Sequence, residues 1–259
     1  MAELMPDSTR PDSTRPGSRT PDRRPVLVVD FDGTVYRDDG PVRFYAEHAA
    51  GSLPNEWRGR FLDLFEAYLE QGVAVADRVA DESAAAVLRS SVDAWGAAAG
   101  LAALSGVGPA ATEQAFLASR QYMLTASCRV TAVPALVEAF EKLRGDVRIV
   151  LATNSPAGGL APLLDRLGVT PLFEEVVSGA NKPEGLRRWI AAELADRPAA
   201  ELFSLGDHYF NEIEPAMAVG ACAGYIDRFG RADGPATVIA PVVEDILPGI
   251  FAWAGRANS

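Results

Sequence analysis

The chain has 259 residues, 48% apolar and 23% charged, which is enough to bury a substantial core and is typical of a soluble globular protein. Its 35 acidic and 24 basic residues give a net charge of −11, which argues against nucleic acid or an anionic membrane as a partner. The two cysteines, Cys128 and Cys222, indicate neither a disulfide framework nor a cysteine metal site. No apolar stretch is as long as a membrane span and no secretory signal is evident, so we expect a cytoplasmic protein.

Residues 1–24 contain a short repeat, in which Pro-Asp-Ser-Thr-Arg at 6–10 recurs at 11–15. Frequent prolines and few apolar side chains predict a disordered tail. A transit peptide is the alternative, but such peptides are poor in acids and this segment carries Asp7, Asp12 and Asp22.

After the tail, short apolar runs alternate with helical patterns. Strands are predicted at 26–30, 147–153, 175–178, 202–206 and 221–226. Helices are predicted between them, near 157–167, 183–195 and 212–219. Strands separated by helices indicate an α/β fold with a parallel sheet, helices on both faces and right-handed crossovers. We therefore assign residues 25–40 and 131–259 to one α/β core.

Residues 41–130 have no strand pattern and are rich in helical spacing. Asn55 is predicted to cap a helix that ends at Gly72, and further helices are expected from Asp77 toward Gly100 and from Pro109 toward Cys128. An insert that leaves the carboxyl end of the first strand would lie above the active edge of the sheet and could act as a lid. The alternative is a separate helical domain without a role in catalysis.

The first strand ends in the string Val-Val-Asp-Phe-Asp-Gly-Thr-Val, which places Asp30 and Asp32 two residues apart at a strand end. Ligands of open α/β sheets collect at this edge, and unpaired carboxylates there favour a cation as partner. Asp30 could be a nucleophile toward phosphorus that forms an aspartyl phosphate, or it could be only a metal ligand or cap. Asp32 could then act as general acid and base.

Two further strand ends and one loop carry candidate residues. Thr153 could bind a phosphoryl oxygen, although Ser155 before Pro156 also resembles an ordinary helix N-cap. Lys182 opens a helix and is one of only two lysines in the chain, which favours a role as a point charge on phosphate. Asp207 ends the 202–206 strand, so that Asp30 and Asp207 would suffice to hold magnesium. His208 is interpreted as a turn or packing residue.

Together, DFDGT at 30–34, Thr153, Lys182 before proline and GDHYFNE at 206–212 resemble the four motifs of the haloacid dehalogenase-like (HAD) hydrolase superfamily, in its helical-cap phosphatase type. The resemblance implies a Rossmann-like sheet of order 5-4-1-2-3, Mg²⁺ and a phosphoaspartate intermediate. It makes Asp30 the nucleophile and a metal ligand, and Asp32 the acid/base that binds metal through its backbone carbonyl.

The resemblance also implies that Thr153 and Lys182 hold the phosphoryl group and that Asp207 completes the metal site. Further phosphate contacts are expected from Phe31, Gly33, Thr34 and Asn154. The 41–130 insert resembles the helical cap of that family, with residues 35–42 as hinge and flap and Asp39-Gly40 as a tight turn within it. The motif after Asp207 departs from the family pattern at His208 and Glu212, so the metal-supporting residue could be Asn211, Glu212 or Glu214.

The resemblance thus implies a phosphatase for a small phosphorylated metabolite. A phosphomutase or phosphotransferase with the same intermediate is the alternative, and a non-catalytic ligand-binding protein on this scaffold is a third possibility. The sequence selects neither the substrate nor the oligomeric state. Specificity is expected from cap or flap residues, with these candidates: Arg89, Arg120, Tyr122, Arg129, Tyr36 and Arg37.

Overall fold

The computed structural model of the protein describes residues 22–258, so the predicted disorder of residues 1–21 lies outside the described residues. Residues 22–24 lie against the α/β core. The Arg24 guanidinium contacts Glu174 at 2.7 Å, and the Arg197 guanidinium donates to the backbone carbonyl oxygens of Asp22 and Arg24. The described part of the core therefore starts a few residues before the expected boundary at residue 25.

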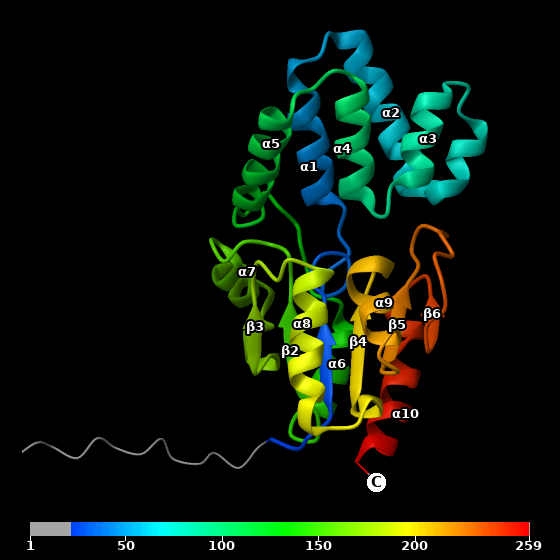
Figure 1. The fold of residues 1–259 in the computed structure, drawn as a ribbon. Helices are drawn as coiled ribbons and strands as arrows, with labels where there is room; N and C mark the ends of the chain where they lie inside the picture. The colour runs from blue at the N-terminus through cyan, green and yellow to red at the C-terminus, as the bar shows by residue number, and fades with distance from the viewer. Residues whose placement is uncertain (1–21, 259) are drawn as a thin grey trace, which may run out of the picture.

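The core contains one six-stranded parallel sheet (Figure 1). Its strands are β1 (Val26–Val29), β2 (Arg148–Ala152), β3 (Glu175–Val177), β4 (Leu202–Gly206), β5 (Cys222–Ile226) and β6 (Val238–Ala240). The order β3-β2-β1-β4-β5-β6 is the implied order 5-4-1-2-3 read from the other edge, with β6 added. All five predicted strands are present, and β1 lies between β2 and β4 at the centre of the sheet.

Helices cover both faces of this sheet. On one face α8 (Glu184–Glu193) and α9 (Glu214–Met217) pack against side chains such as Val28. The other face, to which Leu27 and Val29 point, is covered by α6 (Pro134–Leu143), α7 (Leu160–Leu167) and α10 (Leu247–Ala257). Because successive strand residues point to opposite faces, a strand buried on both sides requires the continuous apolar run that β1 has.

The insert forms a helical cap above the carboxyl edge of the sheet (Figure 1). Its helices are α1 (Gly40–Ala49), α2 (Asn55–Gln71), α3 (Glu82–Ser90), α4 (Ala94–Leu104) and α5 (Pro109–Tyr122). They bury an apolar cluster of their own, in which Phe65 and Tyr68 of α2 are completely buried. The predicted cap at Asn55 is wrong by one residue, because Pro54 occupies the N-cap position and Asn55 already belongs to the helix.

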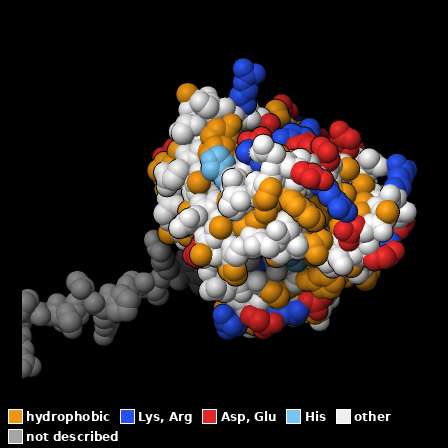
Figure 2. Space-filling view, turned by 90° about the horizontal axis from the view of Figure 1, so that it is seen from above, with side chains coloured by type: hydrophobic (Ala, Val, Ile, Leu, Met, Phe, Trp, Pro, Cys, Tyr) orange, Lys and Arg blue, Asp and Glu red, His pale blue; other side chains and the backbone are white. Residues whose placement is uncertain are grey.

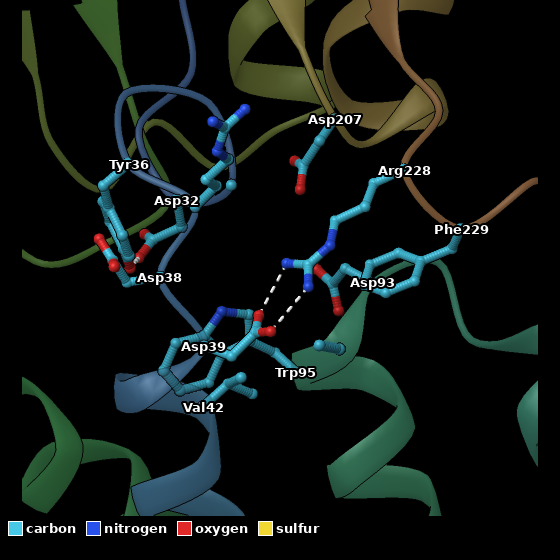
Figure 3. Close-up of a pocket in the computed structure, with 13 residues that line it drawn as sticks. Asp32, Tyr36, Asp38, Asp39, Val42, Asp93, Trp95, Asp207, Arg228 and Phe229 are labelled. Atoms are coloured by element: carbon cyan, nitrogen blue, oxygen red, sulfur yellow. Dashed lines mark hydrogen bonds and ion pairs between the residues drawn. The ribbon is translucent and has the colours of Figure 1, made fainter. Parts of the chain in front are cut away.

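The predicted turn at Asp39-Gly40 is wrong. Gly40 is the first residue of α1, and Asp39 occupies its N-cap position. The Asp39 carboxylate accepts two hydrogen bonds of 2.7 Å from the Arg228 guanidinium, as Figure 3 shows. A helix can start here because Pro41 falls in its first turn, where a missing N–H costs little.

A loop after β5 attaches the cap to the core on a second side. The Val73 N–H donates to the Phe229 carbonyl at 3.0 Å, and the Phe229 ring stacks on Tyr68 of α2 with 4.9 Å between centroids. The Arg231 guanidinium also donates to the carbonyl of Ser91 just after α3. The insert therefore packs over the sheet edge at which the candidate residues lie, rather than standing apart from it.

Seen from above, the cap face carries acidic and basic side chains interspersed with apolar ones (Figure 2). Across residues 22–258, every helix is too short or too polar to cross a membrane.

Candidate active site

Three of the predicted residues come together because three neighbouring strands end at the same edge. Asp30 follows β1, Thr153 follows β2 and Asp207 follows β4. Their position is fixed by the sheet, since the Asp30 N–H donates to Leu205 O and the Thr153 N–H donates to Val177 O, each at 2.9 Å. Asp30 and Thr153 are buried, so the structure places two of the polar groups expected to carry chemistry away from bulk water.

The turn after β1 brings Asp207 close to the Asp30 strand end. Gly33 has a φ of +83°, and a Cβ atom built on it would lie 2.0 Å from Oδ2 of Asp207. Burial raises the pKa of Asp207 well above its ordinary value, and the nearby Asp30 and Glu212 carboxylates raise it further. Position 33 thus requires glycine for two reasons, namely its positive φ and the close approach of the Asp207 carboxylate.

Lys182 reaches the site from the loop after β3. Its Nζ donates to Oδ1 of Asp30 and to Oε1 of Glu212, both at 2.6 Å, and the side chain is only 2% exposed. Burial opposes the charge, but the two carboxylates outweigh it and raise the pKa of Lys182. For Asp30, burial raises the pKa and the Lys182 ammonium opposes the rise. Lys182 therefore remains a cation beside the predicted nucleophile.

Glu212 belongs to a π-helical turn (Tyr209–Ile213) that follows β4. Its Oε2 accepts from the His208 N–H at 2.9 Å while Oε1 binds Lys182. Asn211 lines the cavity beside the site, whereas Glu214 forms an ion pair with Arg187. His208 Nδ1 accepts from the Asn211 N–H at 3.3 Å and caps the π turn, as expected of a turn residue.

Asp32 lies beside Asp30 with both carboxylate oxygens bound by donors. Ser155 Oγ donates to Oδ2 at 2.9 Å, whereas Oδ1 accepts from the Tyr36 hydroxyl and, at 2.6 Å, from Nη1 of Arg120 in α5. Burial raises the pKa of Asp32, but Arg120, Tyr36 and Ser155 outweigh it and lower the pKa. In this arrangement Asp32 is a carboxylate held by Arg120 of the cap, Tyr36 of the hinge and Ser155 of the core.

The N-cap interpretation of Ser155 is therefore wrong. Helix α7 begins at Leu160, and the Ser155 hydroxyl binds Asp32 instead. Sequence reasoning considered Arg120 and Tyr36 only as general specificity candidates and missed their contact with Asp32. Of the other specificity candidates, Arg37 pairs with Glu244 and Tyr122 stacks on Phe44.

The remaining predicted phosphate contacts surround Asp30 in different ways. The Phe31 side chain is completely buried in the core, which leaves only its backbone for a ligand. Thr34 is also buried, and its hydroxyl lies 3.4 Å from Oδ2 of Asp30. The Asn154 side chain accepts the Lys182 N–H at 2.7 Å and so holds the lysine loop. Phosphate binding by Phe31, Gly33, Thr34 and Asn154 stays a prediction.

A cavity of about 180 Å³ lies between these residues and the cap. The cap contributes Asp93 and Trp95 from the start of α4 and Phe116 and Arg120 from α5. The hollow continues past Asp207 toward the hinge, where Asp39 and Arg228 lie (Figure 3). A wider hollow of about 510 Å³ adjoins the cavity and shares Asp93, Trp95 and Phe116 with it, so the part of a ligand that lies away from Asp30 has further room.

The site also has a charge imbalance that a cation would relieve. The cavity is lined by five acidic side chains and by two basic ones. The acidic residues are Asp30, Asp32, Asp93, Asp207 and Glu212, and the basic residues are Lys182 and Arg120. Within residues 22–258, no group of three or more His, Cys, Asp or Glu side chains is already arranged around a metal position. Magnesium needs few protein carboxylates and takes its other ligands from water and phosphate, so the Asp30 and Asp207 carboxylates and the Asp32 carbonyl fit its chemistry.

No model of a known protein family matches the chain, and no curated protein matches it by sequence. Solved structures do match its fold. A predicted phosphoglycolate phosphatase from Haemophilus somnus has a TM-score of 0.57 and 16% identity, with 89% of this chain and 100% of that chain covered. A protein of Bacillus subtilis, described as a HAD-hydrolase bound to magnesium, has a TM-score of 0.55 and 11% identity, with 89% and 98% covered.

An L-2-haloacid dehalogenase from Xanthobacter autotrophicus has a TM-score of 0.52 and 14% identity, with 88% of this chain and 99% of that chain covered. This chain thus has the haloacid dehalogenase-like fold, with a Rossmann-like parallel sheet and a helical cap inserted after the first strand. Since the similar structures include enzymes of different reactions, the fold alone does not select the reaction.

Proposed function

We propose that this chain is a Mg²⁺-dependent phosphatase that hydrolyses a small phosphorylated metabolite through a phosphoaspartate at Asp30. The observation that carries the proposal is the contact of Lys182 with Asp30, 2.6 Å long and buried at the end of the central strand. It leaves Asp30 with one oxygen held by a cation and the other, Oδ2, within 3.4 Å of the Thr34 hydroxyl. Such a carboxylate is oriented for attack, and the same lysine can neutralise phosphoryl charge.

In the first step an Asp30 oxygen attacks phosphorus, and the bond from phosphorus to the ester oxygen breaks. Because Arg120, Tyr36 and Ser155 hold Asp32 as a carboxylate, Asp32 must first take up a proton from solvent. It then gives this proton to the leaving oxygen, so the product leaves as a neutral alcohol group. In the second step Asp32 takes a proton from water as the water oxygen attacks phosphorus. The bond between Asp30 and phosphorus then breaks, which releases inorganic phosphate and regenerates the carboxylate.

Thr153 and Lys182 would hold the equatorial phosphoryl oxygens during both steps, since both line the cavity beside Asp30. Asp30, Asp207 and the Asp32 backbone carbonyl would hold Mg²⁺, which when bound offsets the negative charge of the phosphoryl group. The cap excludes bulk water from the site and so strengthens these charge interactions.

The presence of Asp32 supports phosphoryl transfer over attack on carbon, because only the former needs an acid/base beside the nucleophile. A phosphomutase would use the same residues but return the phosphoryl group to its substrate. A panel of small phosphoesters, assayed for free phosphate with and without Mg²⁺, tests the proposal, with Asp30→Asn as the blank. Phosphate release without isomerised product supports the phosphatase, isomerisation supports the mutase, and identical turnover by Asp30→Asn excludes both.

A further inference from the structure

Arg120 is a cap side chain that is buried in the cavity beside two aromatic rings. Its guanidinium carbon lies 4.9 Å from the Trp95 ring centroid and 4.7 Å from that of Phe116, so both rings contact the planar group. The side chain is only 11% exposed. Both aromatic contacts are of the cation–π type, which holds the cation in place without using its N–H groups.

The hydrogen bonds of Arg120 are incomplete. Nη1 binds Oδ1 of Asp32 at 2.6 Å and lies 3.5 Å from the sulfur of Met123. Within residues 22–258, the Nε of Arg120 is the one buried side-chain nitrogen or oxygen that has no hydrogen-bond partner. A buried donor left unsatisfied costs free energy, so such a group calls for an explanation in a ligand or a function.

Arg120 lies where the leaving group of a substrate would bind, and not where the phosphoryl group would bind. Lys182 and Thr153 lie at the Asp30 end of the cavity, whereas Arg120 contacts Asp32, the residue proposed to protonate the leaving oxygen. Atoms of the leaving group must therefore come within a few ångströms of the guanidinium. The Trp95 and Phe116 rings stand at 75° to each other, so at most one of them lies parallel to the guanidinium plane. The donor that is left for a ligand is Nε, which has no hydrogen-bond partner.

We propose that Arg120 is a specificity-determining residue that binds a carboxylate on the leaving group, so that the substrate is the phosphate ester of a small hydroxy acid. A planar carboxylate accepts two parallel hydrogen bonds from a guanidinium edge and would satisfy the orphaned Nε. This edge consists of Nε and Nη2, so Nη1 can keep its hydrogen bond to Asp32 while the carboxylate is bound. This inference rests on the proposed function, from which it takes the reaction. The assignment of a carboxylate as the bound anion comes from the surroundings of Arg120 alone.

The test compares esters that differ only in this carboxylate, namely 2-phosphoglycolate with ethyl phosphate and 3-phosphooxypropanoate with propyl phosphate. We expect a kcat/KM ratio of acid to neutral ester of about 10 to 100, the range that charge-assisted hydrogen bonds confer. In Arg120→Leu the ratio should fall to near 1 through loss of turnover of the acid, and Arg120→Lys should be intermediate. Arg60→Leu removes an exposed cap arginine from α2 that does not line the cavity, and it should keep the wild-type ratio.

Equal turnover of acid and neutral esters by the wild type would overturn the inference, as would an equal loss on both in Arg120→Leu. A preference for esters with a second phosphate instead of a carboxylate would overturn the carboxylate assignment. Melting temperatures show whether Arg120→Leu is folded, and Arg120→Lys serves as the second variant if it is not.

Calorimetric binding of 2-phosphoglycolate and ethyl phosphate to the full chain separates this inference from the proposed function. If no phosphate is released from any ester, the proposed function fails. Tighter binding of 2-phosphoglycolate that is lost in Arg120→Leu still supports the carboxylate site, and equal binding of the two esters contradicts it.

Discussion

Gly33 lies so close to Asp207 that any side chain at position 33 would collide with the Asp207 carboxylate, because a Cβ atom there would come within 2.0 Å of Oδ2. The two residues are far apart in sequence and meet only because the strands β1 and β4 are neighbours in the sheet. The glycine therefore sets how closely the second predicted metal ligand can approach the turn after Asp30.

Gly33→Ala should reduce magnesium-dependent activity more than it reduces stability. Its positive φ costs a non-glycine residue about 1–2 kcal/mol, and the methyl group must also displace Asp207. Gly145→Ala is the matched control, since Gly145 has a φ of +101° but no atom within 4 Å of the point that an added Cβ would occupy. We expect both variants to lose melting temperature, Gly33→Ala more than Gly145→Ala because it also displaces Asp207, and only Gly33→Ala to need more Mg²⁺ for half-maximal activity. Equal Mg²⁺ requirements would contradict this role of Gly33.

Removal of Lys182 should destabilise the protein strongly, because it leaves the Asp30 and Glu212 carboxylates buried without their cation. Removing one partner of a buried ion pair lowers the free energy of unfolding by about 3–5 kcal/mol. Lys182→Met should therefore unfold at lower denaturant concentration, and Lys182→Met/Glu212→Gln should recover part of the loss but none of the activity. Chemical denaturation and phosphate release measure the two effects. A double variant no more stable than Lys182→Met would argue against the coupling of the two residues.

Ser155→Ala tests whether the hydroxyl positions Asp32 for proton transfer. The variant removes a 2.9 Å hydrogen bond to Oδ2. We expect kcat/KM, which reports the steps up to release of the leaving group, to fall about tenfold on alkyl phosphates, whose leaving oxygen needs a proton. The fall should be much smaller on p-nitrophenyl phosphate, whose leaving group departs as an anion. Equal losses on both substrates would indicate that Ser155 acts on something other than proton transfer.

Because of Asp93 in the cap, the free energy of unfolding of the metal-free protein should fall as the pH rises. Burial raises the pKa of Asp93, and Asp32 and Asp30 raise it further, so the folded state binds its proton at pH values where the unfolded state has released it. Stability is then lost as the pH rises from the unfolded pKa, about 3.9, through the higher folded pKa. Asp93→Asn keeps the acceptor for the Gly96 N–H and removes the charge.

We therefore expect Asp93→Asn to melt above the wild type at neutral pH in the presence of a chelator, with the difference vanishing below the ordinary carboxylate pKa. Thermal denaturation across this pH range is the measurement. Asp93→Ala is the control, because it also removes the helix cap and should lose about 1 kcal/mol of that gain. A difference that is independent of pH would show that charge is not the cause.

Much of the fold could be predicted because its signals are local. The continuous apolar run of β1, the turn glycine at 33 and the scarcity of lysine around Lys182 are all visible in the sequence, and the structure brings Asp30, Thr153, Lys182 and Asp207 to one edge. Strand β6 was missed because Val238–Ala240 lies between Asp-Gly-Pro at 233–235 and Pro241, which favour a turn or loop. The start of α1 was missed because Asp-Gly also favours a tight turn.

The contacts of Asp32 could not be predicted, because they join segments that are distant in sequence. Arg120 is 88 residues away and Ser155 is 123 residues away. The pairing of β1 with β2 brings Ser155 to the Asp32 carboxylate, and the packing of the cap over the sheet edge brings Arg120 there. Ser155 before proline is also a common helix start, so local reasoning favoured the wrong role.

The most direct test of the proposed mechanism is to identify the residue that carries the phosphoryl group. The Asp32→Asn variant, incubated with Mg²⁺ and p-nitrophenyl phosphate, should accumulate the phosphoenzyme, because this leaving group needs no proton from Asp32 whereas water is no longer activated. Acid quenching and borohydride reduction convert an aspartyl phosphate to homoserine, which peptide mass spectrometry can locate. We predict homoserine at position 30. Modification at another residue, or wild-type turnover with no covalent phosphoenzyme in any quenched sample, would contradict the phosphoaspartate mechanism.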